Sequence, residues 1–196
     1  SHSQEGAWLP DYYRHARMAP GHFWVGLYGV LASPGRGLLV YSPVLVPTLV
    51  ALVVWRAQIP QRPLVVWAAG TTLGHALLLA LYPNWWGGHS FGARLMIDTL
   101  PWTVILAAAG WATANNALHA RWLPQLGVVL AVVATTGLGA YMHWRGVTDP
   151  ETFRWNAWPR PINDDPARAL DWRLPQFLAG VVEQPLPEPP PPLAIG

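Results

Sequence analysis

The stretch YPNWWGGHSFGARLMIDTLP (residues 82–101) lies between two long apolar runs and gathers polar, aromatic and glycine residues in a short space. In lipid, irregular backbone is tolerated only where protein or a water-filled cavity covers it. Tryptophan is enriched at the headgroup level of membranes, because its ring is apolar and its N–H is polar. We therefore interpret this stretch as a loop at a membrane surface, held by Trp85 and Trp86. The following glycines, Gly87 and Gly88, allow a tight turn or the close approach of a ligand.

The composition indicates a membrane protein. The chain is 52% hydrophobic and 11% charged, whereas soluble globular proteins carry about 25% charged residues. A net charge of +2 is too small to suggest nucleic acid as a partner. The absence of cysteine excludes disulfides, thiolate metal sites and a cysteine nucleophile. No HExxH, Walker or dinucleotide motif occurs, so we expect neither a metal site nor a cofactor.

The apolar runs predict an all-α membrane fold with four transmembrane helices, one interfacial or re-entrant helix and an irregular, proline-rich C-terminal tail. The shorter run at residues 22–33 falls below the roughly 20 residues that a span needs, so it is assigned to the interfacial helix. The four predicted spans cover residues 37–55, 64–82, 99–118 and 122–141.

These runs divide the chain into three predicted segments. Residues 1–36 form an extracytoplasmic segment with the interfacial helix, residues 37–141 the four-helix membrane domain, and residues 142–196 an extracytoplasmic tail rich in tryptophan and proline. The tail lacks apolar periodicity, and we expect at most one short helix in it, near residues 166–172 or 175–182. Four spans place both termini and the 82–101 loop on one side of the membrane. The two turns on the other side carry Arg56, Arg62 and Arg121 and no acidic residue, which is typical of a cytoplasmic face.

Two arginines are candidates for binding phosphate. Arg94, with His89, could hold a phosphate group, because guanidinium presents a planar fork of donors that fits phosphate oxygens. The alternative is that Arg94 pairs with Asp98, four residues on, and only holds the loop together. Arg36 lies between two glycines, whose open amides can form an anion-binding concavity. Its alternative is an interfacial arginine that extends to the headgroups.

The other candidates are an acid, a histidine and an aromatic pair. Asp98 enters the membrane edge and could act as a general base, although pairing with Arg94 is the simpler interpretation. His75 lies within a predicted span and could ligate a haem or a chlorophyll-type metal, but a neutral histidine bonded to a neighbouring helix is the commoner arrangement. Trp85 and Trp86 could stack on sugar rings, although an aromatic belt explains them without a ligand.

Three motifs carry a family resemblance. SPGRGLLVYSPVL (33–45), NWWGGHSFGARLMIDTLP (84–101) and DDPARALDWRLPQFLAG (164–180) follow in an order and spacing that resemble the C-terminal part of bacterial polytopic GT-C glycosyltransferases. The similar enzymes are the protein O-mannosyltransferase and aminoarabinose transferase group. The resemblance implies a bacterial inner-membrane, multi-pass protein that uses a polyprenyl-phosphate-linked sugar at the extracytoplasmic face. Arg94 and Arg36 would then position the phosphate.

The resemblance also defines an alternative function. The catalytic acid of such enzymes lies in their first extracytoplasmic loop, and this sequence has no counterpart to that loop, so we assign no catalytic residue here. We expect it in a preceding portion of a longer protein. Alternatively, the chain is a non-catalytic accessory subunit of a larger membrane complex. The expected partners are membrane lipids, a polyprenyl-phosphate sugar and other membrane protein subunits. A haem- or pigment-binding subunit, through His75, is a third interpretation.

Overall fold

The computed structural model describes residues 22–119 and 121–182. Its named elements are all helices, which confirms the all-helical class. Three helical segments are long and apolar enough to cross a membrane: α5 (Arg62–Ala80), the continuous segment of η3 (Arg94–Thr99) and α6 (Leu100–Ala117), and α7 (Trp122–Thr148). The predicted tail beyond residue 182 and the segment before residue 22 lie outside the described residues.

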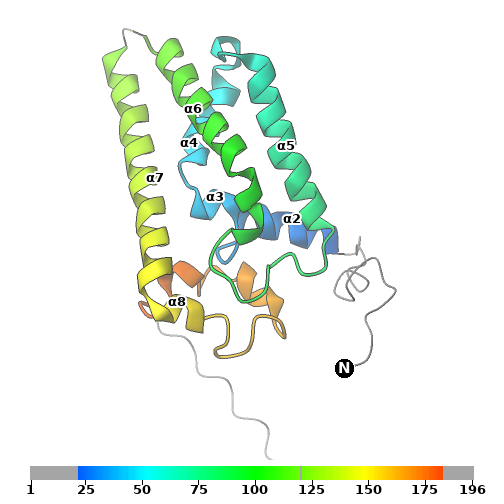
Figure 1. Cartoon of the computed structure of the whole chain (residues 1–196). Helices are drawn as coiled ribbons and strands as arrows, with labels where there is room; N and C mark the ends of the chain where they lie inside the picture. The colour runs from blue at the N-terminus through cyan, green and yellow to red at the C-terminus, as the bar shows by residue number, and fades with distance from the viewer. Residues whose placement is uncertain (1–21, 120, 183–196) are drawn as a thin grey trace, which may run out of the picture.

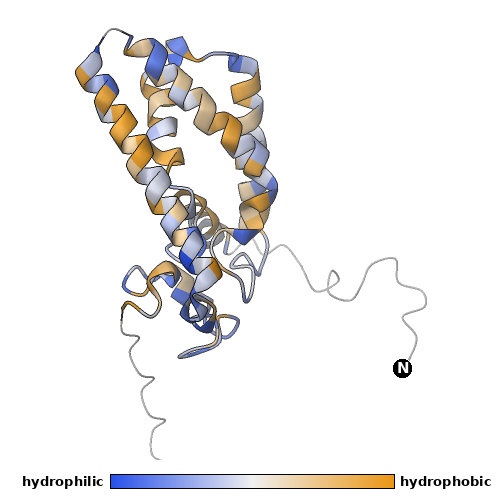
Figure 2. Ribbon diagram, turned by 60° about the vertical axis from the view of Figure 1, so that its left-hand side comes forward, coloured by the Kyte–Doolittle hydropathy of each residue, from blue (hydrophilic) through white to orange (hydrophobic). Residues whose placement is uncertain are grey.

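Four helices run side by side as a bundle (Figure 1). These are α4 (Leu45–Val54), α5, α6 and α7. α4 packs closely on α6, because Gly110 has no side chain: a Cβ there would lie 2.4 Å from the carbonyl oxygen of Thr48. Short connections, including η2 (Arg56–Gln58), close one end of the bundle. Hydrophobic residues cover much of the long helices, as Figure 2 shows, so the exterior suits a lipid environment.

The first predicted span, residues 37–55, is not one continuous helix. It is divided into α3 (Leu38–Tyr41) and α4, with a break at Ser42 (φ −127°, ψ 62°). The break precedes Pro43, whose ring disfavours helical backbone in the residue before it. Ten residues of α4 rise about 15 Å, roughly half of the hydrocarbon thickness of a bilayer. A fourth full-length spanning helix is therefore not confirmed, and three helical segments are long enough to span.

The short N-terminal apolar run forms α2 (Phe23–Ala32), within a residue of the predicted bounds at each end. α2 lies across the end of α5 instead of joining the bundle (Figure 1). The crossing is close because Gly26 lacks a side chain; a Cβ there would lie 2.7 Å from the carbonyl oxygen of Ala80. Trp24 is 77% exposed on the outer side of α2. A membrane-interface location remains a prediction for this helix.

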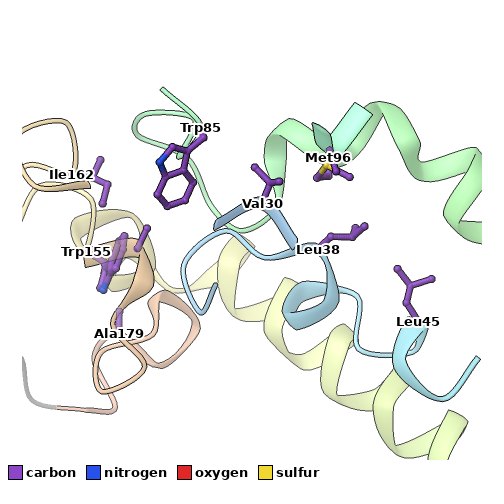
Figure 3. Packing of buried hydrophobic residues seen from close by; sticks show 10 residues of the cluster. Val30, Leu38, Leu45, Trp85, Met96, Trp155, Ile162 and Ala179 are labelled. Atoms are coloured by element: carbon purple, nitrogen blue, oxygen red, sulfur yellow. The ribbon is translucent and has the colours of Figure 1, made fainter. Parts of the chain in front are cut away.

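The C-terminal segment folds back beneath the bundle. It contains α8 (Pro150–Arg154), η4 (Pro166–Leu170) and η5 (Gln176–Leu178), so both regions considered for a short helix contain a 3-10 turn. Its buried residues share one core with the rest of the chain. Figure 3 shows Trp155, Ile162 and Ala179 of this segment, together with Val30 of α2 and Trp85 of the loop, in that core. The core therefore crosses both predicted segment boundaries.

Candidate functional site

Arg36 lies at the centre of a buried polar cluster beneath the membrane helices. Arg36 is only 3% exposed, so its side chain does not extend to the lipid headgroups. All five guanidinium N–H groups have uncharged oxygen acceptors. These are the carbonyls of Gly35 (2.8 Å), Trp86 (2.5 Å) and Gly88 (3.1 Å) and the side-chain oxygens of Gln176 (2.5 Å) and Asn156 (2.8 Å). A phosphate could bind Arg36 only by displacing these contacts.

Burial also determines the electrostatics of Arg36. Removal from water lowers the pKa of its guanidinium to about 10, with a small opposing effect from Tyr41. The group therefore remains charged at neutral pH. The guanidinium of Arg36 makes a cation–π contact with Trp155, whose ring centre lies 5.5 Å from the guanidinium carbon. Arg168 makes a second cation–π contact with the same ring, at 4.7 Å. Arg36 thus acts as a buried structural cation in this arrangement.

Gln176 connects the C-terminal segment to the loop. It is fully buried, and its amide nitrogen donates to the carbonyls of Ser90 (2.8 Å) and Thr152 (2.9 Å). Its side-chain oxygen accepts from Arg36 and from the backbone N–H of Gly92 (3.2 Å). One side chain therefore fixes the loop, α8 and Arg36 relative to one another.

A second buried arginine attaches the same segment to the end of α7. Arg145 donates to the carbonyls of Phe177 (2.9 Å) and Ala179 (2.8 Å) and to the carboxylate of Asp149. The hydrogen bond from Arg145 lowers the pKa of the Asp149 carboxyl. Asp149 also caps α8 by accepting from the N–H of Glu151 (3.0 Å). The end of α7 and the C-terminal segment consequently form one support for the loop.

The two loop tryptophans do not occupy the positions expected of membrane anchors. Trp85 is 4% exposed and packs on α2 at Gly29, where a Cβ would lie 2.1 Å from its ring. Trp86 is half-buried and donates its indole N–H to Asn163 (3.0 Å). Protein contacts therefore hold the loop, which corrects the expectation that these two rings hold it at the lipid headgroups. Both rings remain only sequence-based candidates for sugar stacking.

A cavity of about 650 Å³ is lined in part by the 82–101 loop. Most of its walls are apolar, and they come from α3, the loop, η3, the start of α6, α7 and α8. The polar residues among those that line it are His89, His143, Arg94, Tyr41, Ser42, Ser90 and Thr103. In volume it falls within the range of small-molecule sites in proteins.

Arg94 is the positively charged residue of this cavity. It is exposed, and among residues 22–119 and 121–182 its side chain has no hydrogen-bond or ion-pair partner. His89 lies on the same lining and is also exposed. His143 donates a ring N–H to the carbonyl of Tyr41 (2.9 Å), because a carbonyl can only accept. The cavity thus presents one available guanidinium and two imidazoles above an apolar wall.

Arg94 and Asp98 do not form the expected ion pair. Both lie in η3, which is a 3-10 helix with three residues per turn. Residues four apart on such a helix point in different directions, whereas on an α-helix they share a face. Asp98 is exposed and does not line the cavity. The pairing interpretation is therefore corrected, and Arg94 is left available.

The cavity brings together two of the six predicted site residues, His89 and Arg94. Arg36, Trp85 and Trp86 do not line this cavity. They border a separate space of about 10 Å³, which Arg94 also lines and which is enough for about one water molecule. Gln176 was not among the predicted site residues, although the 164–180 motif contains it. A glutamine between apolar residues carries no signal of its own, because its partners lie far away in the chain.

His75 has the structural role expected of a neutral histidine. Its ring nitrogen donates to the carbonyl of Leu95 (2.8 Å) and so ties α5 to η3. In the described part of the chain, no group of three histidine, cysteine or acidic residues could hold a metal ion.

No family model, curated protein or solved structure matches this chain.

Proposed function

We propose that this chain is the C-terminal membrane portion of a GT-C-like glycosyltransferase and that its cavity binds the phosphate of a polyprenyl-phosphate-linked sugar. The observation that carries this proposal is the position of Arg94, whose guanidinium has no partner among the described residues and lies on the wall of a largely apolar cavity at the end of the membrane helices. The resemblance of the 84–101 motif, which includes Arg94, gives independent support from the sequence.

The chemistry of the cavity fits an amphipathic anion. Arginine binds phosphate through two parallel N–H donors, and such charge-assisted bonds are strong where water is scarce. Ile97 and Leu100 line the cavity, and both are also exposed at the surface of the molecule. A hydrocarbon chain could therefore leave the cavity along these residues and enter the surrounding lipid, while its phosphate remains at Arg94.

The cavity lining supports a binding role more directly than a catalytic one. Among the described residues, no aspartate or glutamate lines it. Transfer of a sugar needs a group that accepts the proton of the incoming nucleophile. In our proposal this base comes from a preceding portion of a longer protein, as the family resemblance implies. The orientation that follows puts the cavity at the extracytoplasmic face of a bacterial inner membrane.

Substitution of Arg94 tests the proposal. The protein, purified in mild detergent, is titrated with polyprenyl phosphate, and bound lipid is measured by native mass spectrometry. Because a hydrogen bond to a charged group contributes about 1.5–3 kcal/mol, Arg94→Gln should weaken binding at least about tenfold. Arg173→Gln is the matched control, since Arg173 is an exposed arginine that pairs with Asp171 (3.1 Å) outside the cavity. Equal binding by Arg94→Gln and the unaltered protein would refute the role of Arg94.

The lack of an acidic residue on the cavity also favours a second candidate, a non-catalytic accessory subunit. Purification in mild detergent from the native membrane separates the two. Recovery of a stoichiometric membrane partner, with no sugar transfer by the assembly, supports the subunit. Transfer activity that depends on Arg94 supports the enzyme.

A further inference from the structure

The closed end of the bundle, opposite the cavity, has an unusually one-sided charge. Its basic residues are Arg56 and Arg62, at the α4–α5 connection, and His119 and Arg121, at the α6–α7 connection (Figure 1). Residues 54–68 and 111–130 contain no aspartate or glutamate. The three arginines are exposed, and none of them takes part in an ion pair within the described residues.

The opposite end of the molecule does not share this property. There, acidic side chains accompany several of the arginines, as Asp149 does Arg145 and Asp171 does Arg173. At the closed end, residues 54–68 and 111–130 supply no acidic side chain that would offset the attraction of the arginines to anions. Charged surfaces of this kind attract anionic lipids with about 1 kcal/mol per arginine near the membrane surface.

A shallow hollow at this end supplies a defined site. It has a volume of about 390 Å³ and is lined by Arg62, Pro63, Val66 and Trp67. Arg62 is the first residue of α5. Val66 lies on the same face, one helical turn further from this end of the bundle. Trp67 is 72% exposed beside it. The hollow therefore presents a guanidinium at the end of the helix, then an apolar wall and an indole below it.

We propose that this hollow binds the phosphate of an anionic glycerophospholipid such as phosphatidylglycerol. Arg62 holds the phosphate oxygens, and the first carbons of the acyl chains lie on Val66 and Trp67. Tryptophan favours this depth in a membrane, because its ring is apolar and its N–H is polar. A zwitterionic headgroup brings a cation into a region without a carboxylate, so it binds less well. This site is separate from the proposed cavity and does not depend on its function.

The test measures lipid binding to the full chain in mild detergent by native mass spectrometry. Phosphatidylglycerol and phosphatidylcholine with identical acyl chains are titrated separately. We expect saturable binding of phosphatidylglycerol, weakened about fivefold by Arg62→Gln and also weakened by Trp67→Ala. Arg173→Gln is the control and should leave this binding unchanged, because Arg173 is an exposed arginine that pairs with Asp171 (3.1 Å) away from the hollow. Inorganic phosphate at millimolar concentration should not displace the lipid, since the hollow also contacts the acyl chains.

Each alternative result overturns the proposal. Equal binding of the two lipids means that the headgroup charge is not recognised. Unchanged binding by Arg62→Gln removes the hollow from the interaction. Weakened binding by Arg173→Gln means that the loss caused by removing an arginine is not specific to the hollow, and displacement by inorganic phosphate indicates a general anion site without lipid recognition.

Discussion

Replacing Arg36 by lysine tests the polar cluster beneath the bundle most directly. The substitution keeps the positive charge and most of the side-chain length, so it isolates the contribution of the guanidinium geometry. Arg36 uses five N–H groups on five oxygen atoms of the protein. An ammonium group has three donors. At least two of the five hydrogen bonds from residue 36 are therefore lost.

The expected loss follows from these contacts. A hydrogen bond to a charged group contributes about 1.5–3 kcal/mol, so the loss of two such bonds lowers the free energy of unfolding by about 3–6 kcal/mol. Loss of the planar stacking on Trp155 adds to this. The whole folding free energy of a typical domain is about 5–15 kcal/mol, so the variant should be markedly less stable.

Unfolding by a denaturing detergent, followed by circular dichroism, gives the measurement. Arg154→Lys is the matched control, because Arg154 is 65% exposed and makes one ion pair, with Glu151 (3.4 Å). Exposed pairs of this kind contribute about 0–1 kcal/mol, so this variant should resemble the unaltered protein. If the two variants lose stability equally, the five hydrogen bonds of Arg36 do not stabilise the fold as argued here.

Three further predictions concern single positions. Gly29→Ala should lower the thermal midpoint, with a cost of about 1–3 kcal/mol from overpacking against the Trp85 ring. Gly137→Ala should leave that midpoint unchanged or raise it, since nothing lies within 4 Å of a Cβ there and alanine favours helix. For Asp149, whose pKa is lowered by the hydrogen bond from Arg145, the stabilising contribution is complete above the ordinary pKa of 3.8 and is lost as pH falls through the lower, folded-state value. Unfolding measured at decreasing pH should therefore show an acid-dependent component that Asp149→Asn lacks; an identical pH profile for the two proteins would contradict this assignment.

The sequence predicted the helices whose formation depends on local pattern. Long uncharged runs predicted α5, α6 and α7, and a shorter run predicted α2, because chain length and apolar content are sufficient to identify such segments. The break at Ser42 also has a local cause in Pro43, but the apolar run continues through it and hides the interruption. The hydropathy of a segment indicates that it lies in an apolar environment, but it does not indicate whether its helical hydrogen bonds continue without a break.

The site was predictable only where a residue acts without distant partners. Arg94 and His89 stand out in the sequence, and the structure places both on the cavity. The environment of Arg36 was not predictable, because its acceptors at Asn156 and Gln176 are ordinary amides. The prediction of an Arg94–Asp98 ion pair was wrong because it required an α-helix, whereas the chain forms a 3-10 helix here.

The contacts of Arg36 also impose an order on biosynthesis. Its two amide partners, Asn156 and Gln176, follow it by 120 and 140 residues in the chain. At translation rates of about 5–20 residues per second, they emerge roughly 6–28 s after Arg36. Throughout that interval the membrane helices can insert, but the guanidinium lacks the acceptors that it has in the finished fold. A ribosome stalled before residue 176 should thus leave an inserted bundle whose end at the 82–101 loop is still open to protease.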